Sequence, residues 1–357
     1  MSDLGMIGTT KRVTVRDPFL DNAKGLLVVL VVLGHLLETI PIAAADGVYK
    51  LIYAFHMAAF VAVSGYLSRN FRATPRQCRG LVTMLLVPYI VVQVLLSLER
   101  MVFNGADFSL NLFVPGFAIW YLLALVVWRL MTPLLLRIPH PLLISTAVSI
   151  LSVTYGGVSG ELAGARILSF LPFFTLGLLA TPAHVETFKR LTSRLWVRAS
   201  CAVFFVVALA VIFLMHDRIA RAWLYMYGKV DKFGLSNTEN VLVRVVVLAV
   251  ATALMFAFLA IVPRTRNIFT PLGEATIYVY VLQIIILYPL LPVIGAWTGW
   301  NVAGTVAILA GGVALALLLA TRPVRRATRW LIDPVGFWTP LLRRSASPEA
   351  TVPGAPR

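Results

Sequence analysis

The chain alternates between long apolar stretches and short connections that carry charged residues, Pro or Gly. Each apolar stretch runs for about 20 residues, the length that an α-helix needs to cross the hydrocarbon core of a bilayer. This pattern predicts an all-α, polytopic membrane helix bundle of about ten transmembrane helices. The expected spans are 19–40, 51–69, 80–98, 117–136, 141–159, 166–181, 197–215, 241–262, 273–294 and 302–321.

Basic residues are distributed unevenly over the connections between these spans. Every second connection is rich in Lys or Arg, an excess that is typical of cytoplasmic loops. Both termini are therefore expected to be cytoplasmic, in a multi-pass protein of the cell membrane. The longest connection on the other side, about 216–240, is the best candidate for a lid or a substrate contact. The basic clusters are Lys11, Arg12 and Arg16; Arg69, Arg72, Arg76 and Arg79; Arg137; Lys189, Arg190, Arg194 and Arg198; Arg264 and Arg266; and Arg322, Arg325, Arg326 and Arg329.

Composition supports the membrane assignment. A hydrophobic fraction of 59%, a charged fraction of 13% and a mean hydropathy of +0.87 exclude an ordinary water-soluble domain. Membrane orientation explains the net charge of +16 better than nucleic-acid binding does. The two cysteines, Cys78 and Cys201, are far apart and suggest neither a disulfide framework nor a metal site. We divide the chain into a cytoplasmic N-terminal segment (1–18), a transmembrane domain (19–335) and a cytoplasmic tail (336–357) expected to be disordered.

The first expected span carries ionisable residues in a regular pattern. Ten residues, all apolar or Gly, separate Lys24 from His35. Over these eleven steps a helix returns to within roughly 20° of its starting direction and advances by roughly 16 Å. Asp21 precedes Lys24 by three positions and Glu38 follows His35 by three, so one helix face carries all four groups. Burying such groups in lipid is costly, so this face indicates a functional site. The alternative is that these residues only hold neighbouring helices together.

A second histidine is expected at the depth of the first. The first span runs outward and holds His35 near its outer end, whereas the second runs inward and holds His56 near its outer start. The two imidazoles should therefore lie at similar depth. The alternative for His56 is a structural hydrogen bond to a backbone carbonyl at a helix contact.

Cations are expected nearer the cytoplasmic surface. Arg69, Arg72, Arg76 and Arg79 are spaced 3, 4 and 3, which would align them on one helix face. Such a stripe suits anionic lipid or the phosphates of a nucleotide-bearing cofactor, with ordinary positive-inside anchoring as the alternative. Arg129 lies well inside the fourth span, where it would either extend to the inner surface or bind a phosphate or a pantetheine amide.

These residue types suit acyl transfer. An imidazole takes up a proton near neutral pH, so a histidine in a membrane cavity is a suitable general base for a hydroxyl that attacks a thioester. The anionic half of an acyl-CoA needs cations at the cytoplasmic surface, and its pantetheine arm has a length of the same order as the rise from Lys24 to His35. Trp120 and Tyr121 are typical of outer-interface aromatics and would also suit stacking on a sugar. The same polar face would equally describe a proton-coupled transporter.

Several segments in the first half of the chain resemble the acyltransferase-3 family of integral membrane acyltransferases, in particular its fucose 4-O-acetylase-like branch. The family signature of a basic residue, ten residues and a histidine is matched by Lys24 and His35, and its Arg-x-x-Arg motif by Arg76 and Arg79. The matching segments are R-D-P-F-L-D-N-A-K-G with V-L-G-H, A-F-H-M-A-A-F-V-A-V-S-G-Y, L-V-P-Y, I-W-Y-L-L-A-L-V-V-W-R-L and F-L-P-F-F-T-L-G.

The resemblance implies about ten helices and O-acylation of a sugar, a glycan precursor or another hydroxyl compound. The donor would be an acyl-CoA such as acetyl-CoA, taken from the cytoplasm as a co-substrate, with no permanently bound cofactor. By this resemblance His35 is the catalytic base, and Lys24 is a donor-site or structural partner. Two positions depart from the family pattern. Lys24 stands where many members have Arg, which replaces a bidentate group with a point charge, and Gln283 stands where the branch often has His.

We therefore expect a membrane O-acyltransferase in which His35 deprotonates the acceptor hydroxyl. Glu38 would orient this base or His56 would assist it. A transporter of a solute or glycolipid along the same polar face is the alternative, and a sensor or scaffold without catalysis is a third interpretation. The residues expected to hold the acyl-CoA donor are Lys24, Arg76, Arg79 and Arg129.

Overall fold

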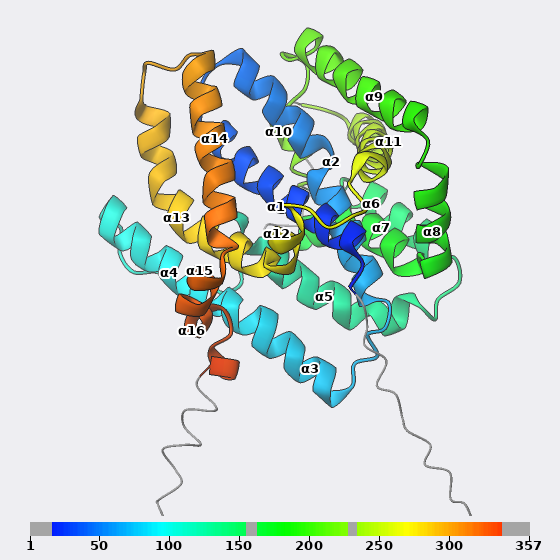
Figure 1. Ribbon diagram of the computed structural model, residues 1–357, viewed down its shortest axis with the longest axis horizontal. Helices are drawn as coiled ribbons and strands as arrows, with labels where there is room; N and C mark the ends of the chain where they lie inside the picture. Colours follow the sequence, from blue (N-terminus) through cyan, green and yellow to red (C-terminus); the bar gives the residue numbers. More distant parts are fainter. Residues whose placement is uncertain (1–15, 155–162, 228–233, 338–357) are drawn as a thin grey trace, which may run out of the picture.

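A computed structural model describes residues 16–154, 163–227 and 234–337 of the chain (Figure 1). These residues form helices and no strand, in agreement with the expected all-α class. The elements are α1 (Pro18–Glu38), α2 (Ala43–Ser68), α3 (Pro75–Leu81), the π-helix η1 (Val82–Leu86), α4 (Val87–Asn104), the 3-10 helix η2 (Phe117–Ile119), α5 (Trp120–Leu135), α6 (Pro141–Leu151), α7 (Gly164–Leu179), α8 (Pro182–Leu191), α9 (Leu195–Leu214), α10 (Arg221–Leu224), α11 (Asn237–Ile261), α12 (Thr270–Glu274), α13 (Thr276–Ala296), α14 (Val302–Leu319), α15 (Arg322–Ala327) and α16 (Arg329–Ile332).

Eight helices in the described part of the chain are long and apolar enough to cross a membrane. They confirm the polytopic bundle and cover eight of the ten expected spans. The remaining two, 141–159 and 166–181, look different: the first contains α6, which has 11 residues, and the second is α7, which turns by 93° into α8. The turn occurs because Ala180 is extended and the Thr181 side chain caps α8, whose first residue is Pro182. Counting this bent pair as one span gives nine.

The centre of the bundle is formed by α1 and α2. In their most apolar windows, 67% of α1 residues and 78% of α2 residues are buried inside the protein, against 6% for α9 and 22% for α14. Figure 1 shows α1 and α2 in the middle of the bundle and α9 at its edge. The ionisable face of α1 is therefore enclosed by protein, whereas the apolar surface of α9 is left for lipid.

Glycines let α2 and α7 touch through their backbones. A Cβ atom added at Gly65 would lie 2.1 Å from the Phe174 carbonyl oxygen, and one added at Gly177 would lie 1.8 Å from the Ala62 carbonyl oxygen. Membrane helices commonly use small residues for such close packing. This contact fixes α2, which carries His56, against α7, which carries Arg166.

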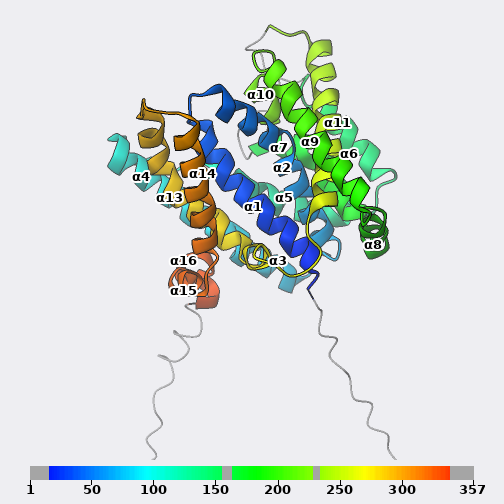
Figure 2. The same cartoon turned by 45° about the horizontal axis from the view of Figure 1, so that its top comes forward.

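The two described ends of the chain lie at the same end of the bundle. Figure 2 shows the start of α1 there, together with α3, α15 and α16. Lys189 of α8 reaches the same end, where its Nζ lies 3.2 Å from an oxygen of Asp17. These elements carry several of the basic clusters, so the positive-inside rule predicts that this end is cytoplasmic. The predictions for residues 1–15 and for the tail after residue 337 concern residues outside the described ranges.

Candidate active site

A polar cavity of about 410 Å³ lies at the outer ends of α1 and α2. Its lining comes from residues that are far apart in the sequence, including the segment between α9 and α11 that we expected to contact substrate. The residues used below are His35 and Glu38 of α1, Tyr53 and His56 of α2, Trp120 of α5, Arg166 of α7, Tyr225 and Tyr227 of the outer segment, and Tyr280 of α13.

His35 reaches this cavity one turn before the end of α1. The residue is 9% exposed, and its ring packs against the ring of Phe117 at a centroid distance of 4.6 Å. Its Nδ1 is buried and has no hydrogen-bond partner among the residues that the structure describes. Buried polar groups are normally paired, so an unpaired ring nitrogen beside a cavity is suited to a proton of a bound ligand.

His56 lines the same cavity, so α1 and α2 do present both imidazoles to one space. Its Nδ1 donates to the carbonyl oxygen of Ile52 at 2.7 Å, which leaves Nε2 as the nitrogen able to accept a proton. The Tyr53 ring meets the His56 ring edge-on at 4.8 Å. The carbonyl bond considered in the sequence analysis is therefore present, and it orients the ring without removing its basic nitrogen.

Glu38 is bound to Tyr225 instead of His35. Its Oε1 accepts a hydrogen bond from the Tyr225 hydroxyl at 3.0 Å, and that hydroxyl accepts one from Tyr49 at 2.6 Å. Burial raises the pKa of Tyr225 to about 12, so its hydroxyl stays protonated and able to donate at neutral pH. The Glu38 carbonyl also accepts from Arg221 at 3.1 Å. Glu38 thus joins the outer end of α1 to the segment that follows α9.

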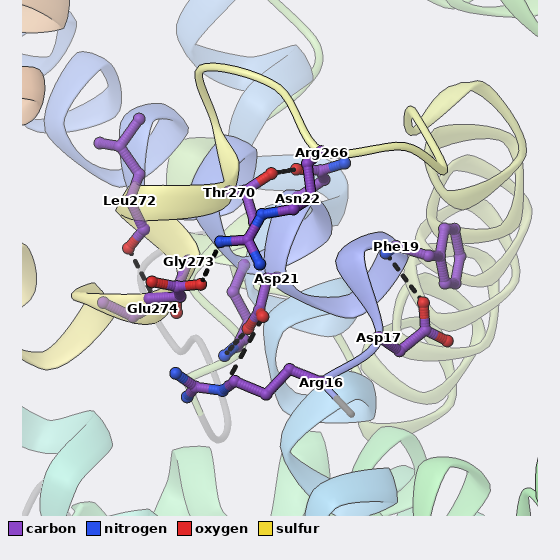
Figure 3. A network of polar contacts seen from close by, with 12 residues as sticks. Arg16, Asp17, Phe19, Asp21, Asn22, Arg266, Thr270, Leu272, Gly273 and Glu274 are labelled. Carbon is purple, nitrogen blue, oxygen red and sulfur yellow. Dashed lines mark hydrogen bonds and ion pairs between the residues drawn. The ribbon is translucent and has the colours of Figure 1, made fainter. Parts of the chain in front are cut away.

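Lys24 lies in the first turns of α1, at the opposite end of the helix from His35, and does not line the cavity. Its Nζ forms an ion pair with Asp21 at 2.8 Å, and Nε of Arg16 lies 3.9 Å from the same carboxylate. Figure 3 shows this region, where Asn22 and Thr270 share a hydrogen bond of 2.7 Å. Asp21 therefore neutralises Lys24, and the hydrogen bond of Asn22 holds this end of α1 against α12.

The three candidate donor arginines also lie away from the cavity. Arg76 and Arg79 are exposed on α3 at the cytoplasmic end. Arg129 is half-buried in α5, and its Nε donates to the Ser68 hydroxyl at 3.2 Å. Their assignment to the donor stays a prediction, as do the assigned roles of His35, His56, Glu38 and Lys24.

A series of polar side chains on α2 and α5 extends from Arg129 towards the level of the cavity. Ser68 donates to the Ser64 carbonyl oxygen at 2.7 Å, and the Ser64 and Tyr121 hydroxyls share a hydrogen bond of 2.5 Å. The ring of Tyr280, which lines the cavity, lies 5.8 Å from that of Tyr121. Hydroxyl groups of α2 and α5 therefore link the two depths of the bundle.

Sequence reasoning did not identify Arg166, Tyr53 or Tyr280 as lining residues. Arg166 had one available signal, because it is a base at the outward start of an expected span, where bases are uncommon. Tyr53 and Tyr280 look like ordinary aromatics of apolar helices and carried no signal. Gln283 is fully buried and lies outside the cavity lining, and its Nε2 donates to the Tyr280 carbonyl oxygen at 3.2 Å.

Comparison with known proteins places the chain in a family. The nodulation protein NolL of Sinorhizobium fredii is 33% identical over 126 residues, which are 30% of this chain and 34% of that protein. The NolL protein of Mesorhizobium japonicum is 47% identical over 58 residues, 15% of this chain and 16% of that protein. The chain therefore spans about a third or less of these curated relatives, and no solved structure was found to match it. The model of the acyltransferase domain matches residues 17–321, and the chain belongs to the acyltransferase-3 family.

Proposed function

We propose that the protein is a membrane O-acyltransferase that moves an acyl group, most simply acetyl, from acyl-CoA to a hydroxyl of a carbohydrate acceptor. The observation that carries this proposal is the Nδ1 of His35, which has no hydrogen-bond partner among the described residues and lies beside a cavity lined by polar and aromatic side chains, within a domain of an acyltransferase family. No permanently bound cofactor is needed, because acyl-CoA enters as a co-substrate. The protein would work as a multi-pass protein of the plasma membrane.

The chemistry requires one base at the acceptor hydroxyl. The hydroxyl proton passes to His35 as the oxygen attacks the thioester carbonyl carbon. The resulting tetrahedral species collapses with cleavage of the C–S bond, and the CoA sulfur takes the proton back from the imidazolium. His56, with its Nδ1 engaged by Ile52, offers Nε2 as a second base in the same cavity.

Donor binding would use the cytoplasmic half of the bundle. A pantetheine arm that follows α1 would place the thioester at His35 and leave the phosphates near the level of Lys24, since the two residues are roughly 16 Å apart along the helix. Lys24 forms an ion pair with Asp21 at this level. Arg76 and Arg79 are exposed at the cytoplasmic end and suit the phosphates, whereas Arg129 suits a deeper amide or phosphate group.

Acceptor binding would use the aromatic and acidic side of the cavity. Tyr227 presents a ring of the type that stacks on sugars, and the carboxylate of Glu38 can accept hydrogen bonds from sugar hydroxyls. The mixture of ring faces and hydrogen-bonding groups favours a carbohydrate over a purely apolar acceptor.

The test is release of free CoA from acetyl-CoA by the purified protein, comparing wild type with His35→Ala and His56→Ala over a panel of sugar and glycolipid acceptors. We expect His35→Ala to lose at least about 100-fold in rate, because general-base catalysis contributes on the order of 10²–10⁴. Each variant is checked for folding by size-exclusion chromatography and for binding of acetyl-CoA. Movement of an acceptor across proteoliposomes without any CoA release would instead support the transporter.

A further inference from the structure

Arg166 is a positive charge in the cavity that forms no ion pair within the part of the chain that the structure describes. Arg166 of α7 lines the cavity that contains His35. Among the described residues no carboxylate lies within ion-pairing distance of Arg166. Glu38 lines the same cavity but is engaged by Tyr225. By contrast, Lys24 and Lys50 each pair with an aspartate of their own helix, at 2.8 and 2.6 Å.

The surroundings of Arg166 hold its guanidinium in place and leave much of its hydrogen-bonding capacity unused. The guanidinium carbon lies over the Trp120 ring at 4.8 Å and over the Tyr227 ring at 4.4 Å, and one nitrogen donates to the Tyr227 hydroxyl at 2.6 Å. Tyr227 is itself fixed, because the buried Arg244 of α11 donates to its carbonyl oxygen at 2.5 Å. Of the five guanidinium N–H groups, one donates to Tyr227, and within residues 16–154, 163–227 and 234–337 no other hydrogen bond of this guanidinium is found, which suits it to a planar anion.

We propose that Arg166 is the binding site for an anionic group of the acceptor, so that the preferred acceptor is a sugar carrying a carboxylate or a phosphate. A guanidinium fixed between two rings is pre-organised for a bidentate, charge-assisted pair with a bound anion. The CoA phosphates are unsuitable as this anion. When the thioester of the donor lies at His35, the phosphates are separated from this cavity by the length of the pantetheine arm. A uronic acid or a sugar phosphate places its anion within one sugar of the reacting hydroxyl.

This inference rests on the proposed acyl transfer, and it predicts a preference that the general proposal does not. The purified protein is assayed for CoA release with three matched acceptors, namely methyl glucoside, methyl glucuronide and glucose 1-phosphate, and with the same set in the galacto and manno series. The faster of the two charged members identifies carboxylate or phosphate as the anion. We expect kcat/KM for it to exceed that of the neutral sugar by about 10- to 100-fold, the usual range for hydrogen bonds to a charged group.

Arg166→Gln is expected to remove this preference by lowering kcat/KM for the charged sugar far more than for the neutral sugar, and Arg166→Lys is expected to retain part of it. Arg218→Gln is the matched control, since Arg218 is an exposed base near the outer end of α9, outside this cavity. Equal kcat/KM for charged and neutral sugars in the wild type would overturn the inference. An equal loss on both acceptors in a folded Arg166→Gln protein would also overturn it, because Arg166 would then act in folding or in stabilising the transition state.

A binding measurement separates this inference from the acyl-transfer proposal. Ligand-induced stabilisation by the same charged sugars is measured on wild type and on Arg166→Gln without any donor. Stabilisation that depends on Arg166 supports the anion site even if no acceptor releases CoA, in which case acyl transfer alone has failed. Stabilisation that is absent from both proteins, or unchanged by the substitution, counts against the anion site.

Discussion

Gly177 in α7 is the position where a single methyl group should do most damage to the cavity. A Cβ atom there would lie 1.8 Å from the Ala62 carbonyl oxygen and 2.9 Å from the Tyr66 nitrogen, both of them backbone atoms of α2. Ordinary contact begins at 3.4 Å, and no side-chain rotation relieves a clash with backbone. In Gly177→Ala, α2 and α7 must therefore move apart, and they carry His56 and Arg166.

The expected cost follows from two opposing effects. Forcing extra volume into a packed contact costs about 1–3 kcal/mol or more, whereas replacing a helical Gly by Ala returns about 1 kcal/mol of helix propensity. Gly311 in α14 provides the control, because nothing lies within 4 Å of a Cβ added there. Gly311→Ala should therefore show the propensity gain alone, and the two alanine variants should differ by about 1–3 kcal/mol in the free energy of unfolding.

The assay is thermal unfolding in one detergent, followed by size-exclusion chromatography after heating, together with CoA release at a temperature where all variants remain folded. We expect Gly177→Ala to melt below wild type and to lose activity, and Gly311→Ala to melt at or slightly above wild type with wild-type activity. If Gly177→Ala has the same melting temperature as Gly311→Ala and keeps full activity, the backbone contact between α2 and α7 is wrong. The shape assigned to the cavity would then be wrong as well.

Three further predictions concern the two ends of α1. Tyr225→Phe removes the hydroxyl that binds Glu38, so the acceptor KM should rise by about 5- to 50-fold with little change for acetyl-CoA; an unchanged acceptor KM would exclude this role. Burial raises the pKa of Tyr225 to about 12. The stability that its protonated hydroxyl contributes should therefore be complete below about pH 10 and be lost as the pH rises towards 12. The melting temperature of the wild type should fall over this range, and that of Tyr225→Phe should lack this fall. Lys24→Met should raise the KM for acetyl-CoA by about tenfold or more, whereas Lys24→Arg should bind the donor at least as well as wild type. If the wild type and both variants have equal KM values for acetyl-CoA, Lys24 is not part of the donor site.

The sequence by itself determined most of the membrane architecture. Stretches of about 20 apolar residues can satisfy their backbone in lipid only as helices, so eight of the ten expected spans could be placed by counting. Helix periodicity placed Lys24 and His35 on one helix at two depths. The opposite directions of α1 and α2 were enough to bring His56 to the cavity of His35. These features depend on neighbours along one helix or on its direction, which are local properties of a chain.

The tertiary structure alone decided which partners meet across the bundle. Apolar periodicity says little about which neighbour a lipid-embedded helix chooses, so the meeting of Arg166 with Trp120 and Tyr227 could not be counted along the chain. For the same reason, the acid expected to orient His35 was found bound to Tyr225. The bend between α7 and α8 was hidden by an apolar run that continues almost to the turn. Long-range packing sets these contacts, because the cavity is lined by α1, α2, α5, α7 and α13, by the 3-10 helix η2 and by the segment after α9.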